Sequence, residues 1–99
     1  MKYRKKPVII EAVLLERNRV SFQECYLFIG EYTNQTSQIG QDKWYEFVDK
    51  ELEKDGIILQ VLEGDHLAKW GNMVIRGVEG EYYSCDHDIF KKTYEEVTE

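Results

Sequence analysis

The sequence predicts an α+β domain in which two short helices pack against an antiparallel β-sheet. Apolar residues recur at helical spacing only in two short segments, one near the start and one near the middle of the chain. β-branched and aromatic runs dominate the C-terminal half, where turn residues recur about every eight residues. A single domain is expected for residues 1–99, because a chain of this length buries one core and no more.

The first element is expected to be a strand at residues 7–15. This segment, PVIIEAVLL, is rich in β-branched and apolar residues, which suits a strand buried on one face or on both. Pro7 has no donor N–H, so it should lie at the start of the strand or on a sheet edge.

Two amphipathic helices are expected, near residues 22–29 and 43–54. Ser21 and Glu24 have the spacing of a capping box before the first helix, and Gly30 is a natural C-terminal stop. Both helices are too short to be stable alone, so they must pack on the sheet.

The second helix is predicted from one apolar stripe. Asp42 can cap it and Gly56 ends it, while residues 31–41 have no apolar period and are expected to form a loop. The stripe consists of Trp44, Phe47, Val48 and Leu52.

The C-terminal half is expected to form a meander of short antiparallel strands. Turn signals stand at positions 64–65, 71–72 and 79–80. With the first strand, the meander gives about five or six strands in a twisted or barrel-like sheet. The expected strands are 57–63, 65–70, 73–78, 81–85 and 91–97.

Composition argues against several classes of protein. The net charge of −6 argues against general nucleic-acid binding, because phosphate affinity is mainly electrostatic. No apolar run approaches the roughly 20 residues of a membrane span. Glu11 interrupts the apolar stretch that follows the basic start, so no signal peptide is expected. Two cysteines are too few for a disulfide framework, which favours a cytoplasmic location.

Charge is unevenly distributed between the two ends. Two interpretations stay open: a basic arm for an acidic partner, or neighbouring strands whose opposite charges face each other, which is favoured. The basic residues are Lys2, Arg4, Lys5 and Lys6, and the acidic ones are Glu95, Glu96 and Glu99.

Four consecutive polar residues, Cys85, Asp86, His87 and Asp88, are the candidate metal or acid–base groups. Adjacent residues of an extended chain point to opposite faces, so at most two of them converge without a tight turn. A polar turn is therefore expected, in which Asp88 caps or pins the segment and Ile89 and Phe90 enter the core. Cys85 and His87 remain weak metal candidates, and no cofactor is expected.

A catalytic centre is not expected either. Cys85 would need His66 or His87 beside it, together with an orienting third group and an oxyanion hole. A small core residue is the favoured interpretation of Cys85.

A binding surface has more support, because aromatic and arginine side chains gather in the meander. Such side chains dominate interface hot spots and stacked ligand sites. Tyr82 and Tyr83 are consecutive, so a regular strand cannot turn both toward one core, and one is expected to be exposed or in an interface. The candidate binding residues are Trp70, Arg76, Tyr82, Tyr83 and Tyr94.

Both ends of the chain resemble a family of small, largely uncharacterised bacteriophage and prophage proteins. Those proteins open with KYRKKPV and IEA and end with LEGD, GV, GE, a YPC segment, DIF and TYE. The matching segments are KYRKKPVIIEA (2–12), LEGDHLAKWGN (62–72), VIRGVEGEYYSC (74–85) and DIFKKTYEEV (88–97).

Two departures from this pattern fall at turns. The family's Asp–aromatic pair is Asn72–Met73 here, and Asn suits a turn as well as Asp does. Its Pro-Cys-Lys-Pro-Asp becomes Ser84-Cys85-Asp86-His87-Asp88, so positions 86 and 87 are not shared ligands.

The resemblance implies a phage or prophage accessory protein in the bacterial cytoplasm, and carries over no catalytic residue. The expected activity is non-enzymatic binding to a host protein or to a second copy, through the meander and its sheet edges. The alternative is a protein that binds or sequesters a nucleotide-like ligand, with Trp70 or the tyrosines stacking on the base. Arg76 or the N-terminal lysines would then meet phosphate. A minor virion component is a third possibility.

Overall fold

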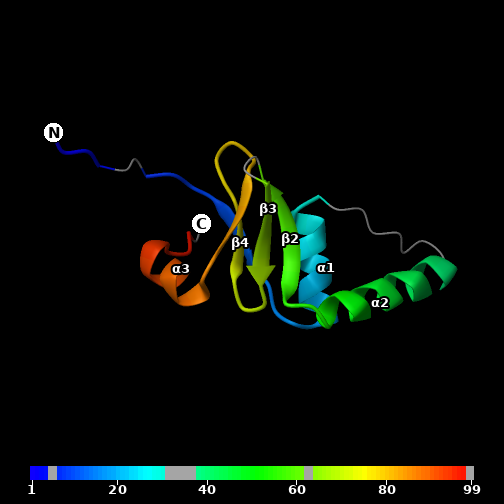
Figure 1. Cartoon of the computed structure of the whole chain (residues 1–99). Coiled ribbons are helices and arrows are strands. Elements are labelled where there is room, and N and C mark those ends of the chain that lie inside the picture. The colour runs from blue at the N-terminus through cyan, green and yellow to red at the C-terminus, as the bar shows by residue number, and fades with distance from the viewer. Residues whose placement is uncertain (5–6, 31–37, 62–63, 98–99) are drawn as a thin grey trace.

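Three helices and five antiparallel strands make up the described part of the chain, which bears out the predicted α+β class (Figure 1). The computed structural model describes residues 1–4, 7–30, 38–61 and 64–97. In chain order the elements are β1 (Glu11–Leu14), α1 (Arg19–Phe28), α2 (Gln38–Leu52), β2 (Gly56–Val61), β3 (Gly64–Lys69), β4 (Met73–Arg76), β5 (Tyr82–Cys85) and α3 (His87–Thr93).

The strands form two sheets, so the prediction of one continuous meander is wrong. One sheet has the order β1-β4-β5, and the other is the β2-β3 hairpin. In the first sheet Ala12 lies opposite Ile75, which lies opposite Tyr83. Strand β1 occupies the edge of β4 that β3 would have in a meander. The described strands do not close into a barrel.

The corner at Gly71 and Asn72 explains this separation. The sequence predicts a hairpin turn there, but the corner bonds to the end of β1 instead. Leu15 N donates to Asn72 O over 2.9 Å, and Gly71 N donates to Leu15 O over 2.6 Å. Gly71 has φ +94°, a conformation that favours glycine. The chain therefore leaves the hairpin here and enters the other sheet.

Helix α1 begins three residues before the predicted 22–29, and its cap is Asn18. The Asn18 side chain accepts from Ser21 N, which satisfies one free N–H of the first turn. The Ser21 hydroxyl accepts from Glu16 N and donates to Leu14 O. The predicted capping box at Ser21 is therefore wrong, because this hydroxyl is used to fasten the end of β1 to α1.

Helix α2 also begins earlier than the predicted 43–54, so Asp42 lies inside it and is not its cap. Trp44 and Val48 of the predicted stripe are buried, while Phe47 lies at its partly exposed margin. Most of the predicted loop 31–41 lies outside the described residues.

The main core lies between α1, α2, the hairpin and one face of the three-stranded sheet. Phe22 stacks on Tyr26 with 4.6 Å between ring centroids, and Trp44 packs against both rings. Gly56 is required at the base of the hairpin, because a Cβ there would collide with the Ala68 carbonyl. The core consists of Leu15, Phe22, Cys25, Trp44, Val48, Ile57, Leu59, Ala68 and Val74.

The predicted last strand, 91–97, is wrong, because its first three residues belong to α3 and the rest form no strand. Asp86 caps this helix and accepts from Asp88 N and Ile89 N. Tyr94 has extended backbone at the C-terminal end of the helix. Residues 95–97 follow without a strand partner in the described chain. A cap and a single apolar pair, Ile89 and Phe90, are a weak helical signal in a sequence.

The three-stranded sheet is covered differently on its two faces. Residues directly opposite across an antiparallel pair share a face, so Val13, Val74 and Ser84 lie on the face toward the main core. Ala12, Ile75 and Tyr83 lie on the other face. Figure 1 shows α3 on one side of the strands and α1 and α2 on the other. Ile75 is fully buried outside the main core, so α3 and the residues after it cover a second, smaller apolar layer.

Neighbouring residues of β2 provide a test of the main core. Leu59 is 2% exposed and Ile58 is 55% exposed. Leu59→Ala is expected to lower the free energy of unfolding by about 2–5 kcal/mol, because it leaves a cavity. Ile58→Ala should lower it by about 0.5 kcal/mol or less. Urea denaturation of both variants checks this, and equal losses would contradict the assigned burial.

Candidate functional site

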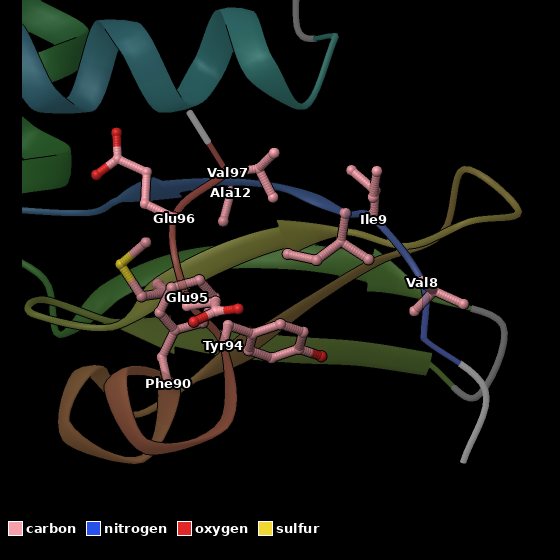
Figure 2. A pocket seen from close by; sticks show the side chains of 10 residues that line it. Val8, Ile9, Ala12, Phe90, Tyr94, Glu95, Glu96 and Val97 are labelled. Carbon is pink, nitrogen blue, oxygen red and sulfur yellow. The ribbon is translucent and has the colours of Figure 1, made fainter. Parts of the chain in front are cut away.

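An open apolar groove lies on the sheet face that points away from the main core (Figure 2). Its volume is about 570 Å³. The walls come from segments far apart in the sequence: the residues before and in β1, the start of β4, and α3 with the residues after it. They are Val8, Ile9, Ile10, Ala12, Met73, Phe90, Tyr94, Glu95, Glu96 and Val97.

Apolar side chains around this groove are left in contact with water. Ile9 is 77% exposed and Val97 is 64% exposed, and Val8 is also exposed. Phe90 and Tyr94 are half-buried, and their rings stack with 4.8 Å between centroids. Figure 2 shows this aromatic pair on one side of the groove and Val8 and Ile9 on the other. The result is an apolar surface with a rigid aromatic wall and an aliphatic wall.

The two ends of the groove differ in charge. Val8 lies at one end, whereas Glu96 and Ala12 lie toward the other (Figure 2). Glu95 and Glu96 are exposed and form no ion pair within the described residues. One end is therefore apolar, whereas the other carries carboxylates beside the apolar side chains of Ala12 and Val97 (Figure 2).

Tyr83 supports the aromatic wall from the sheet. It lies on the same sheet face as Ile75, and its phenol interacts with that of Tyr94. Desolvation, followed by the hydrogen bond with Tyr94, raises the pKa of Tyr83 to about 12. Tyr83 therefore lies next to Tyr94 of the aromatic wall without lining the groove itself.

Arg76 and Tyr82 lie together on the opposite face and fasten the sheet to α1. Arg76 Nη2 donates to Glu11 Oε2 over 2.7 Å, and its guanidinium lies 4.9 Å from the centroid of the Phe28 ring. Tyr82 Oη donates to Phe28 O over 3.0 Å. The hydrogen bond with Glu11 raises the pKa of Arg76. Both side chains thus make polar contacts within the fold, through Arg76 Nη2 and the Tyr82 hydroxyl.

Trp70 is separate from both groups. Its indole Nε1 donates to Lys54 O over 2.7 Å, and the ring packs against the main core. The indole thus joins the end of the hairpin to the segment that follows α2.

The five predicted binding residues therefore do not form one site. The structure pairs Arg76 with Tyr82 and Tyr83 with Tyr94, and of the five only Tyr94 lines the groove. Tyr82 and Tyr83 face opposite sides of the sheet, and each is half-buried. The geometry does not bring Trp70 and Arg76 around a common ligand.

The stretch from Cys85 to Asp88 is the start of α3. Asp86 provides the cap that was expected from Asp88, and Ile89 is exposed where burial was expected. Cys85 Sγ donates to Asp86 O over 3.4 Å. Within the described residues, no group of three His, Cys, Asp or Glu side chains could hold a metal ion.

Sequence reasoning missed Ile9, Phe90 and Val97 as parts of a surface. One signal was present: Val8, Ile9 and Ile10 are consecutive and apolar, so they cannot all face one core. The expectation that the two ends run as neighbouring strands with facing charges is wrong for the described residues: neither 1–4 nor 95–97 is a strand, and Lys2 and Arg4 form no ion pair with Glu95 or Glu96 there. Lys5, Lys6 and Glu99 lie outside the described residues.

Comparison with known proteins gives no relative: no family model, curated protein or solved structure matches the chain. In the part of the chain that the structure describes, no helix is long and apolar enough to cross a membrane. The fold and the groove together define a small mixed α+β domain with an open apolar surface.

Tyr83 is expected to make the stability of the folded chain fall as the pH rises in the alkaline range. Its pKa is about 12 in the folded chain and ordinarily 10, so the unfolded chain releases this proton first. The contribution of this pKa shift to stability is complete below the ordinary pKa of 10. It is lost as the pH rises through the folded pKa of about 12. Tyr83→Phe is expected to reduce the fall in unfolding free energy between about pH 9 and about pH 11. Denaturant titrations at both pH values check this, and an identical fall in both proteins would contradict it.

The two thiols are expected to differ in reactivity. Cys25 is fully buried, and burial raises its pKa to about 12, whereas Cys85 is half-buried. A chromogenic disulfide reagent at about pH 8 should modify one thiol of the folded chain rapidly and the second only after unfolding. In Cys85→Ala the rapid reaction should vanish. Two rapid thiols in the folded protein would contradict the burial of Cys25.

Proposed function

We propose that this chain is a small non-enzymatic binding module of a phage or prophage, whose groove takes an extended segment of another protein chain. The observation that carries the proposal is the exposure of Ile9 and Val97 beside the half-buried Phe90–Tyr94 pair. Covering exposed apolar surface lowers the free energy of the system. Contiguous apolar surface of this kind is typical of interaction sites.

An extended segment fits the groove better than a helix does. Strand β1 is an edge of its sheet, and its pairing with β4 begins only at Glu11. Val8, Ile9 and Ile10 therefore have no strand partner within the described residues. A segment that lies along them can form main-chain hydrogen bonds and place alternate side chains in the groove.

The charge of the groove adds a second requirement for the segment. Glu95 and Glu96 stand at one end without an ion-pair partner in the described structure. Opposite charge across an interface orients the partner and speeds association. The favoured segment is therefore β-branched at one end and carries lysine or arginine at the other.

Binding is favoured over catalysis by the chemistry of the lining. Among the described residues, the ionisable groups of the groove lining are Glu95, Glu96 and the Tyr94 phenol, and this lining includes no cysteine, histidine, serine or lysine. The described lining therefore offers no nucleophile with an adjacent base. The phage setting and a host-protein partner in the bacterial cytoplasm rest on the sequence resemblance of the two ends of the chain.

A selection from displayed random peptides tests the proposal. The chain, immobilised sparsely, is expected to enrich peptides with β-branched residues next to lysine or arginine. Ile9→Glu should abolish this enrichment, because it puts a charge on the aliphatic wall. Val20→Glu is the matched control, since Val20 is similarly exposed but lies on α1. The absence of enrichment by a chain that is a monomer, or enrichment that survives Ile9→Glu, would contradict the proposal.

A further inference from the structure

The N-terminal arm, residues 1–4 and 7–10, has the properties that the groove requires of its occupant. Figure 1 shows the arm extending away from the sheets and helices. Tyr3 is 86% exposed, and Met1, Val8 and Ile9 are exposed as well. The arm thus presents aromatic, aliphatic and basic side chains to water, and no described element covers them.

We infer that the groove is occupied by the N-terminal arm of a second copy of this chain, and that two copies exchange arms reciprocally. This inference rests on the proposed function, because it names the segment that the groove binds. Lys2 and Arg4 supply the basic end, and Val8 and Ile9 supply the β-branched end. A basic end and a β-branched end are the two features that the groove requires of a bound segment.

The direction of the second arm follows from the charges. Val8 and Ile9 line the groove toward the apolar end, and Ala12, further along the chain in β1, lies toward Glu96 (Figure 2). If the second arm runs antiparallel to these residues, its basic end passes Ala12 and reaches Glu95 and Glu96. A parallel arm would carry its basic end past Val8 and away from both carboxylates. Charge complementarity therefore selects the antiparallel arrangement.

An antiparallel pair of identical segments is symmetric about a two-fold axis. Each copy then gives its arm and receives the arm of the other, so one geometry satisfies both grooves at once. The open edge of β1 supports the pairing, because an unpaired edge is a template for a strand from another chain.

The arm cannot occupy its own groove in this way. It is joined directly to Val8–Ile10, which form the aliphatic wall. To reach its own Glu95 and Glu96, the chain would have to reverse and cover the residues from which it continues. A second copy meets no such constraint.

Sedimentation equilibrium of the full chain tests the inference. A dimer is expected, and added salt should weaken it because basic and acidic residues pair across the interface. Ile9→Glu should raise the dimer dissociation constant by about tenfold or more, whereas Val20→Glu should leave it unchanged. A chain that remains a monomer up to about 1 mM would overturn the inference.

Charge reversal tests which segments meet. Lys2→Glu with Arg4→Glu changes only the arm, and Glu95→Lys with Glu96→Lys changes only the groove. Each double variant alone should dimerise weakly, but an equimolar mixture should form a heterodimer, since both of its contacts regain opposite charges. Native mass spectrometry of the mixture measures this. Homodimers of undiminished stability, or a mixture that forms no heterodimer, would overturn the arm exchange.

The peptide selection separates this inference from the proposed function. If the chain is a monomer and still enriches peptides through Ile9, the groove binds a foreign segment and only the arm exchange fails. If the chain neither dimerises nor enriches peptides, both fail.

Discussion

The antiparallel pairing of β1 with β4 is the constraint on which the rest of this structure depends. It joins residues near the start of the chain to residues beyond the hairpin, with Ala12 opposite Ile75 and Leu14 opposite Met73. Two hydrogen bonds between Leu15 and the Gly71–Asn72 corner extend it. Because β1 takes that edge of β4, β3 cannot pair there, and the chain divides into a hairpin and a three-stranded sheet. The Ser21 hydroxyl then ties the end of β1 to α1.

This division gives the sheet two unequal faces, and the inequality creates the groove. The face with Val74 is sealed by two helices and the hairpin. The other face is covered by α3, a helix of seven residues, and by the short extended segment after it. That cover buries Ile75 fully but leaves Ile9 and Val97 exposed. The described elements do not complete this second layer, so apolar surface remains available for a partner.

Aromatic and arginine side chains turn out to have two kinds of role. Arg76, Tyr82 and Trp70 make polar contacts within the fold. These three residues stand out in the sequence as candidate binding residues, but they do not form a common site because each is used to join parts of the fold. Tyr94 instead forms the aromatic wall of the groove with Phe90, and Tyr83 lies beside Tyr94 on the same face of the sheet. A residue type that is frequent in interfaces is therefore a poor guide here until its hydrogen-bond partners are known.

The sequence by itself determined the α+β class, the presence and approximate place of α1 and α2, and the hairpin and strand segments from β2 to β5. These depend on local periodicity and on turn residues, which act over a few positions. It did not determine the helix starts, α3, the separation into two sheets, or the groove. Asn18 and Asp86 cap two of the helices and so decide where they begin. The sequence does not distinguish these caps from neighbouring polar residues, such as Ser21 and Asp88, that can cap a helix equally well. The sheets and the groove were decided only by tertiary structure, because they depend on contacts between Val8–Leu15, Met73–Arg76 and the C-terminal residues. No local pattern encodes which of several apolar strands will take a free edge.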